Sequence, residues 1–154
     1  MSCDLEAAWA VRRAVFVVEQ GVPEDLEIDA LDTLNSTLHV VEYADDGRAV
    51  ATGRAVLDGP GHVHLGRIAV LRDWRGRGLG VAVVRRLESE ALRRYGVVDA
   101  GVRCVELALA AQEHAIGFYQ ALGYELTQRG RFLDAGIWHR DMRRAACERV
   151  SGPT

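Results

Sequence analysis

The sequence of 154 residues contains no lysine, so arginine supplies all 19 of its basic side chains. The absence of lysine excludes a Walker A phosphate-binding loop, a Schiff-base enzyme and a lysine general base. The 19 arginines stand against 22 acidic residues, which leaves a formal net charge of −3. We therefore expect no nucleic-acid partner, because the neutralisation of phosphates requires a basic surface.

Cysteine and long apolar runs are scarce as well. The three cysteines, Cys3, Cys104 and Cys147, show neither a CxxC pair nor a Cys/His spacing. Such a set is typical of reduced thiols and predicts neither a disulfide framework nor a metal site. No run reaches the ~20 apolar residues of a membrane-spanning helix, and the N-terminus lacks the basic segment of a secretory signal. These absences favour a cytoplasmic protein with no membrane partner.

The length and composition suit one domain with one core, because 49% of the residues are hydrophobic and 27% are charged. No linker, repeat or low-complexity stretch interrupts residues 1–150. We expect a single domain over these residues and a frayed tail at 151–154.

The first half of the chain predicts a helix followed by an antiparallel meander. Apolar residues at three- and four-residue steps predict a helix over 4–18, and an acidic loop follows at 19–32. Runs rich in β-branched residues then predict strands at 38–43, 49–57 and 62–70, joined by tight turns.

The second half alternates helices and strands. A helix is predicted over 78–95, with Gly96 as its left-handed C-terminal residue, and another over 112–122, ended by Gly123. Further strands are predicted at 105–109, 124–129 and 137–144. A meander followed by strand–helix–strand–helix predicts an α/β fold with a mixed sheet and helices on its faces.

The most informative stretch is a glycine-rich turn between a predicted strand and a long predicted helix. Glycines stand at 76, 78 and 80, and Arg75 and Arg77 are interspersed with them. The first turn of a helix has unpaired N–H groups and a partial positive charge, and glycine lets the backbone approach phosphate oxygens. The G-x-G-x-x-G dinucleotide fingerprint does not fit, because Val81 stands where a third glycine is needed. The turn therefore favours an anion site, with a plain strand-to-helix turn as the alternative.

Several motifs resemble one known family. Arg75-Gly76-Arg77-Gly78-Leu79-Gly80 fits the pattern R/Q-x-x-G-x-G/A and resembles the acyl-CoA-binding motif of the GNAT superfamily of N-acetyltransferases. Leu109-Ala110-Ala111-Gln112, followed by Phe118-Tyr119 and Gly123-Tyr124, is similar to a second motif of that family. The segments 15–20, 27–32, 51–54 and 136–139 resemble its ElaA/YjcF-like branch. The resemblance covers most of the chain.

The resemblance implies the GNAT acyl-CoA N-acyltransferase fold, whose central, mostly antiparallel mixed sheet splits between two parallel strands, here 62–70 and 105–109. It implies acetyl-CoA as the cosubstrate, with the thioester in the gap between those strands, and no metal. The residues implied in cofactor binding are Ile68, Ala69, Val70, Arg75, Gly76, Arg77, Gly78, Leu79, Gly80, Val81, Gln112 and Phe118.

The implied reaction is direct attack of an amine on the acetyl thioester in a ternary complex, without a covalent enzyme intermediate. Tyr119 matches the family's usual proton donor to the departing thiolate. The proton acceptor remains open. His64 aligns with one histidine of the pair found in arylalkylamine acetyltransferases, and Glu19 and His139 are its rivals. Each of these side chains could instead be structural.

Acidic residues crowd the segment 19–32, and two arginines stand inside predicted strands. The acids could attract a cationic amine by their electrostatic field. Alternatively, Arg54 and Arg67 could pair with Glu19 or with Asp29 and Asp32, because a charge inside a strand is costly unless it is paired. The second interpretation makes the acidic loop a structural clamp.

We expect an N-acetyltransferase that moves an acetyl group from acetyl-CoA to a primary amine of a small molecule or peptide. A non-catalytic acyl-CoA-binding or sensing module is the alternative. The helical pattern begins by Asp4, where GNAT proteins normally have a strand first. The sheet therefore either lacks an edge strand or receives one from a partner, and an exposed edge favours association into a homodimer.

Overall fold

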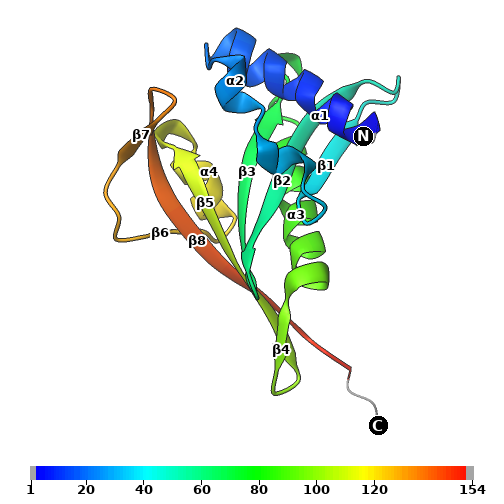
Figure 1. Ribbon diagram of the computed structural model, residues 1–154, viewed down its shortest axis with the longest axis vertical. Helices are drawn as coiled ribbons and strands as arrows, with labels where there is room; N and C mark the ends of the chain where they lie inside the picture. Colours follow the sequence, from blue (N-terminus) through cyan, green and yellow to red (C-terminus); the bar gives the residue numbers. More distant parts are fainter. Residues whose placement is uncertain (1–2, 152–154) are drawn as a thin grey trace. The chain divides into compact units, whose positions relative to one another are not determined.

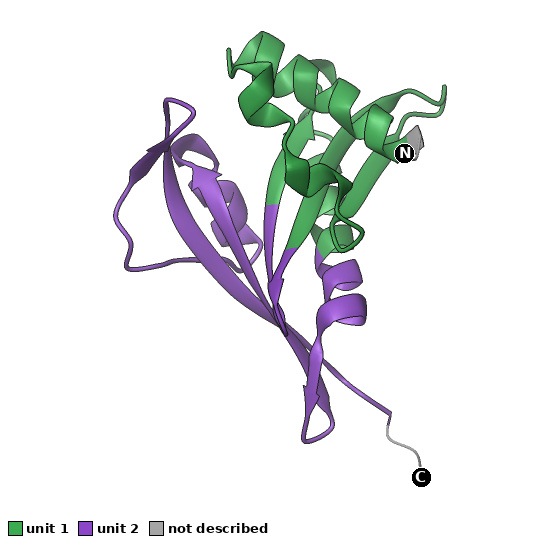
Figure 2. Ribbon diagram, viewed as in Figure 1, with its two compact units in different colours: residues 1–56, 66–87 green, residues 57–65, 88–154 purple. Residues whose placement is uncertain are grey.

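The computed structural model describes residues 3–151, apart from the side chain of Cys3, so the end of the predicted tail at 152–154 lies outside the described residues. The chain divides into two compact units (Figure 2). Unit 1 contains residues 1–56 and 66–87, and unit 2 contains residues 57–65 and 88–154.

Helices and strands follow one another largely as the periodicity predicts (Figure 1). The helical elements are α1 (Cys3–Arg12), the π-helix η1 (Arg13–Glu19), α2 (Glu24–Glu27), the 3-10 helix η2 (Ala30–Thr33), the 3-10 helix η3 (Arg72–Trp74), α3 (Leu79–Tyr95), the 3-10 helix η4 (Glu113–Ala115) and α4 (Ile116–Ala121). The strands are β1 (Leu38–Tyr43), β2 (Ala49–Gly59), β3 (His62–Val70), β4 (Val97–Asp99), β5 (Val102–Gln112), β6 (Glu125–Leu126), β7 (Phe132–Asp134) and β8 (Ile137–Arg149).

The N-terminal helix of unit 1 has one apolar face. Leu5, Ala8, Val11 and Val15 recur at three- and four-residue steps and are all buried, which is the pattern of an amphipathic helix. Val11 and Val15 pack against Ala69 of β3. The predicted helix over 4–18 is confirmed, although its second half is wound as the π-helix η1.

The strands form one open mixed sheet, hydrogen-bonded in the order β1-β2-β3-β5-β8-β6, with β4 on β5 and β7 on β8. β1 and β2 pair antiparallel, from Leu38↔Ala55 onwards. β3 and β5 pair parallel over the four residue pairs from His62↔Glu106 to Leu65↔Leu109. The predicted α/β class, with a mostly antiparallel sheet, one parallel pair and flanking helices, is confirmed.

Unit 2 is built on the long antiparallel pair of β5 and β8, whose ladder runs from Val102↔Arg149 to Gln112↔His139. One face of this pair is apolar, because Leu107, Leu109 and Met142 are buried on it. Both strands are longer than the sequence predicts, whereas the predicted strand at 124–129 shrinks to the two residues of β6. Pairing with a neighbouring strand, rather than local composition, sets these lengths.

The ends of α3 and α4 differ from each other, and α4 is shorter than the predicted helix over 112–122 because β5 extends to Gln112 and η4 follows it. Gly123 has φ +99° and ends α4 in the predicted left-handed conformation. Gly96 is not among the glycines with positive φ, so the prediction of a left-handed residue after α3 is wrong. A side chain is excluded there for another reason, since a Cβ atom would lie 2.5 Å from both the Leu92 carbonyl and the Arg103 side chain.

The expectation of reduced cysteines is wrong for two of the three. Cys104 of β5 and Cys147 of β8 form a disulfide, with their Cα atoms 4.1 Å apart. The two residues are separated by 43 positions in sequence and face each other in the β5–β8 ladder. The register of that ladder, which no local spacing reveals, brings the two sulfurs together.

Reduction of this disulfide is expected to destabilise the protein. Disulfides that close loops of this size contribute about 3 to 5 kcal/mol, so the variant with both Cys104→Ser and Cys147→Ser should lose roughly 5 to 15 °C in Tm. Thermal denaturation with and without a reductant measures the effect. Cys3→Ser is the control and should leave the Tm unchanged. Three free thiols in the unfolded, unreduced protein would contradict the disulfide.

Candidate functional site

The glycine-rich turn lies in unit 1, between the end of β3 and the start of α3. Gly76 and Gly78 have φ values of +76° and +80°, in the left-handed region that side chains disfavour. A Cβ atom at either position would meet nothing within 4 Å. Backbone conformation, rather than crowding, therefore requires glycine here, and the surface above the turn is open.

The start of α3 presents amide groups without partners in the helix. The Ala82 amide donates to the Gly78 carbonyl at 3.1 Å, which is the first hydrogen bond of the helix. The amides of Leu79, Gly80 and Val81 therefore have no carbonyl of a preceding turn to bind. Together with the positive end of the helix dipole, they form a site suited to a phosphate group.

The two arginines of the turn have partners of their own. Arg75 binds the Glu19 carboxylate with both terminal nitrogens at 2.8 Å, and its Nε donates to the Val70 carbonyl at 3.0 Å. Arg77 stacks on the Trp74 ring, 4.4 Å from its centroid. The hydrogen bond from Arg75 lowers the pKa of Glu19. Arg75 thus fastens the turn to the end of η1.

The strand before the turn leaves its partner early. The parallel ladder of β3 with β5 ends at Leu65↔Leu109, so the residues 66–70 of β3 lie beyond it. Ala69 is buried against Val11 and Val15. Ile68 and Val70 are half-buried. These three residues are among those that the family resemblance implies in cofactor binding.

Tyr119 lies on α4 in unit 2. Tyr119 is 9% exposed, and its ring packs edge-to-face against the rings of Phe118 and Tyr124. Burial raises the pKa of Tyr119 to about 12. The Tyr124 hydroxyl, in contrast, donates to Glu88 at 2.7 Å. A phenol that stays protonated can donate a hydrogen bond to a bound ligand.

Two histidines of unit 2 are held in defined orientations. The Nδ1 atom of His64 lies 2.7 Å from Asp58 Oδ1, and 37% of the His64 side chain is exposed. The Nδ1 atom of His139 donates to the Ile137 carbonyl at 2.7 Å, and its buried ring stacks on Phe132. Each contact leaves Nε2 as the atom that accepts a proton. Sequence reasoning missed Asp58, which lies near the end of β2, just before the turn that leads to β3 and His64.

The predicted site residues therefore fall into two groups. Glu19, with residues 68–70 and 75–81, is in unit 1. His64, Gln112, Phe118, Tyr119 and His139 are in unit 2. Gln112 ends β5, opposite His139 in the β5–β8 ladder, and Phe118 is partly exposed on α4.

Comparison with known proteins identifies the family. The model of the Acetyltransferase (GNAT) family matches residues 6–124. The chain is 39% identical over 139 residues to the uncharacterized N-acetyltransferase YjcF of Bacillus subtilis (strain 168). The aligned residues cover 90% of this chain and 90% of YjcF. The chain belongs to the GNAT acetyltransferase family.

Two solved structures agree with this assignment. Escherichia coli ElaA is 27% identical, with a TM-score of 0.78 over 94% of this chain and 92% of that one. An acyl-CoA N-acyltransferase from Pseudomonas aeruginosa is 30% identical, with a TM-score of 0.76 over the same shares. The fold is that of the GNAT acyl-CoA N-acyltransferases, and the chain falls in the ElaA/YjcF-like branch.

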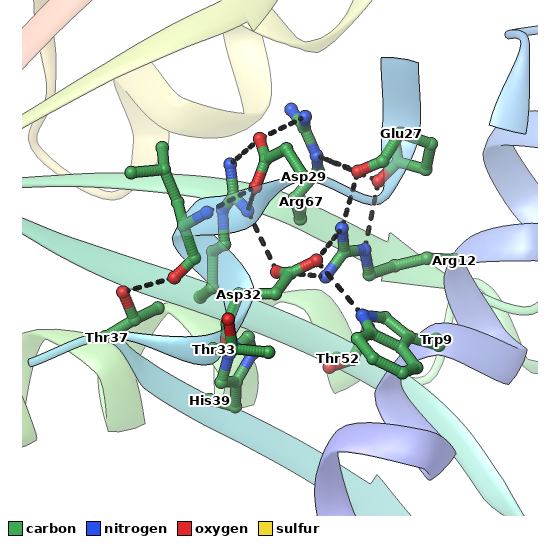
Figure 3. Close-up of polar contacts among 12 residues, drawn as sticks. Trp9, Arg12, Glu27, Asp29, Asp32, Thr33, Thr37, His39, Thr52 and Arg67 are labelled. Carbon is green, nitrogen blue, oxygen red and sulfur yellow. Dashed lines mark hydrogen bonds and ion pairs between the residues drawn. The ribbon is translucent and has the colours of Figure 1, made fainter. Parts of the chain in front are cut away.

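The GNAT domain contains a buried charge cluster in unit 1, which joins α1 and the acidic segment to the sheet (Figure 3). Arg12 of α1 donates to Glu27 Oε2 at 2.9 Å and to Asp32 Oδ1 at 2.7 Å. The Trp9 ring nitrogen donates to Asp32 as well, at 3.0 Å. The side chains of Arg12, Glu27 and Asp32 are 1%, 5% and 0% exposed. Charges this deep are tolerated only because each has a partner.

The strand arginines complete the cluster. Arg54 of β2 pairs with Asp29 at 2.7 Å and with Asp32 at 2.9 Å. Arg67 of β3 lies 2.8 Å from Glu27 Oε2 and 3.3 Å from Asp29 Oδ2. The predicted pairing is confirmed for Arg54 with Asp29 and Asp32 and for Arg67 with Asp29. The alternative pairing with Glu19 is wrong, because Glu19 binds Arg75 instead, and Glu27 is an additional partner that the sequence did not indicate.

The pKa directions follow from these contacts. The hydrogen bond from Arg54 lowers the pKa of Asp29. Burial would raise the pKa of Asp32, but hydrogen bonds from Arg12 outweigh it and hold that pKa well below its usual range. Burial raises the pKa of Glu27 despite its arginine partners. The acidic segment is thus a set of ion pairs rather than a free negative surface.

Within residues 3–151, no helix is long and apolar enough to cross a membrane. No group of three or more histidine, cysteine, aspartate or glutamate side chains in that part of the chain is arranged to hold a metal ion.

Loss of Arg12 is expected to destabilise the protein far more than loss of its neighbour Arg13. Arg12→Ala leaves Glu27 and Asp32 buried without their shared cation, which costs about 3 to 5 kcal/mol. Arg13 pairs with Glu24 at the surface, so Arg13→Ala should cost no more than about 1 kcal/mol. The free energy of unfolding in urea measures both. Equal losses in the two variants would refute the stabilising role of Arg12 in the buried charge cluster.

Proposed function

We propose that this protein is an N-acetyltransferase that moves an acetyl group from acetyl-CoA to a primary amine of a small molecule or peptide. One observation carries the proposal: the turn with left-handed Gly76 and Gly78 presents three unpaired helix amides to an open surface. Membership of the GNAT family supports the same cofactor, because that family transfers acyl groups from CoA thioesters.

The diphosphate of acetyl-CoA is assigned to the amides between Arg75 and Val81. Anions are stabilised there by the helix dipole and by direct N–H donors. The pantetheine arm is assigned to the backbone of Ile68, Ala69 and Val70, with the Val70 amide as the donor to the thioester carbonyl. Gln112 and Phe118 complete the assigned cofactor contacts.

The chemistry assigned to the site is direct attack of a neutral amine on the thioester carbonyl. The new C–N bond forms, the C–S bond breaks, and CoA leaves as a thiolate. Tyr119 is assigned as the donor to that sulfur. Its raised pKa keeps the phenol protonated at neutral pH, although it also makes Tyr119 a weaker acid than tyrosine in water.

His64 is assigned as the base that takes the ammonium proton. Its contact with Asp58 fixes the ring and leaves Nε2 to accept the proton. Glu19 is a weaker base, because the hydrogen bond from Arg75 lowers its pKa. His139 is the second histidine candidate, with its Nδ1 atom already committed to the Ile137 carbonyl.

Measurements of CoA binding and of turnover test the cofactor site and the catalytic role of Tyr119 separately. Gly78→Glu should abolish CoA binding, measured by calorimetry, because a carboxylate would repel the diphosphate. Gly78→Ala, which has the same backbone cost without the charge, is the control and should retain part of the affinity. Tyr119→Phe should bind CoA normally but lose roughly 10²-fold or more in kcat for thiol release with an amine.

Two outcomes would count against the proposal. Undiminished CoA affinity in Gly78→Glu would remove the turn from the site. CoA binding without thiol release, for a broad panel of amines, would favour a non-catalytic acyl-CoA-binding or sensing module instead.

The pH profile of kcat/KM identifies the base. If a histidine is the base, the rate should fall as pH drops through the range near neutrality, where histidine takes up a proton. A Glu19 base would instead keep the rate high down to below pH 4.5, its ordinary value, because its pKa is lowered. We expect the near-neutral limb to be lost in His64→Ala and kept in Glu19→Gln and His139→Ala. Its loss in His139→Ala alone would reassign the base.

A further inference from the structure

Arg67 has an unusual backbone conformation for its place in the fold. It lies within β3, yet its φ is +54°. A residue with a side chain rarely adopts this left-handed region inside a strand, and such a residue persists only where its surroundings hold it. Arg67 is also the second residue beyond the end of the β3–β5 ladder and directly precedes Ile68.

The Arg67 side chain is held from the acidic segment (Figure 3). Its Nε atom lies 2.8 Å from Glu27 Oε2 and 3.1 Å from the Glu27 carbonyl. Its Nη2 atom lies 3.3 Å from both Asp29 Oδ2 and the Leu26 carbonyl. Two carboxylates and two main-chain carbonyls therefore bind one guanidinium.

The partners of Arg67 are themselves fixed. Glu27 is shared with Arg12 of α1, and Asp29 is shared with Arg54 of β2. Asp29 is also the N-cap of η2, because its side chain accepts a hydrogen bond from the Leu31 amide at 3.1 Å. Moving the Arg67 guanidinium would take one of two cationic partners from the buried Glu27 and from the part-buried Asp29, which is disfavoured. The charge cluster therefore holds Arg67 in its left-handed backbone conformation.

We propose that Arg67 is a positioning residue for acetyl-CoA, whose ion pairs with Glu27 and Asp29 fix the backbone path of Ile68 to Val70. The inference rests on the proposed function, which assigns the pantetheine arm to that segment. The peptide groups that follow a left-handed residue point in directions set by its φ and ψ, so the clamp determines how the next three residues present their N–H and C=O groups.

The planar fork of arginine suits this role, because one side chain reaches carboxylates and carbonyls on several sides at once. Glycine at position 67 would permit the left-handed conformation without enforcing it. Alanine at position 67 would adopt the left-handed conformation only at an energetic cost, and it has no side-chain contacts that would hold the backbone there. The two substitutions should therefore differ in a defined order.

The test measures the Kd for CoA by calorimetry on folded protein. Arg67→Ala should weaken CoA binding by about 10- to 100-fold, as expected when one or two hydrogen bonds to the cofactor are lost, and Arg67→Gly should lie between Arg67→Ala and the wild type. Arg86→Ala removes another arginine–carboxylate pair of unit 1, with Glu42, and is the control that should bind normally. Partial unfolding would lower the number of binding sites but not change the Kd of the folded fraction.

The ion pairs themselves are tested by a double-mutant cycle. Asp29→Asn alone should also weaken CoA binding, and combining it with Arg67→Ala should add little, because both changes break the same clamp. Amide hydrogen exchange gives a readout without CoA: exchange at residues 68–70 should accelerate in Arg67→Ala and stay unchanged in Arg86→Ala.

The outcomes separate this inference from the proposed function. If the wild type binds CoA and Arg67→Ala binds it with the same Kd and unchanged exchange at 68–70, Arg67 is not a positioning residue. If the wild type does not bind CoA at all, the proposed function fails, and with it the link between the clamp and the cofactor.

Discussion

Arginine–carboxylate pairs hold both the strand residues and the turn to which the cofactor is assigned. Arg67 binds Glu27 and Asp29 just before Ile68, and Arg75 binds Glu19 where the glycine-rich turn begins. All three carboxylates lie between the last residue of η1 and the N-cap of η2, so one N-terminal region fixes the strand and the turn together. An anion site made of backbone amides depends on such bracing, since amides have no side-chain freedom with which to adjust to a ligand.

The same pairs decide what the acidic segment can do. Five of its six carboxylates are paired with arginines: Glu19 with Arg75, Glu24 with Arg13, and Glu27, Asp29 and Asp32 with Arg12, Arg54 and Arg67. A matched set creates little net field beyond a Debye length. Steering of a cationic amine, which the composition of this segment suggests, therefore has no strong source here, and the choice of acceptor must depend on short-range contacts.

Much of the architecture could be predicted because it follows from local pattern. The helix that carries the apolar residues from Leu5 to Val15 and the turn at Gly76 and Gly78 could be predicted. Helix periodicity and a positive φ at glycine both depend on residues that are close in sequence. Apart from the pairing of the strand arginines with the acidic segment, features that depend on distant segments could not be predicted. The disulfide of Cys104 and Cys147 depends on a strand register, and the absence of a side chain at Gly96 depends on the approach of another strand. The Glu19–Arg75 pair likewise joins positions 56 apart.

That pair bears on the chemistry as well as on the fold. A carboxylate that takes a proton in each turnover would give up its ion pair with Arg75 at that moment, and the interaction that lowers the pKa of Glu19 is the same one that would be lost. The turn would then loosen while the diphosphate is still bound to it. His64 avoids this conflict, because its partner Asp58 takes no part in bracing the turn and a protonated histidine keeps, and strengthens, its contact with a carboxylate. A proton acceptor separate from the clamp is therefore the arrangement that this structure favours.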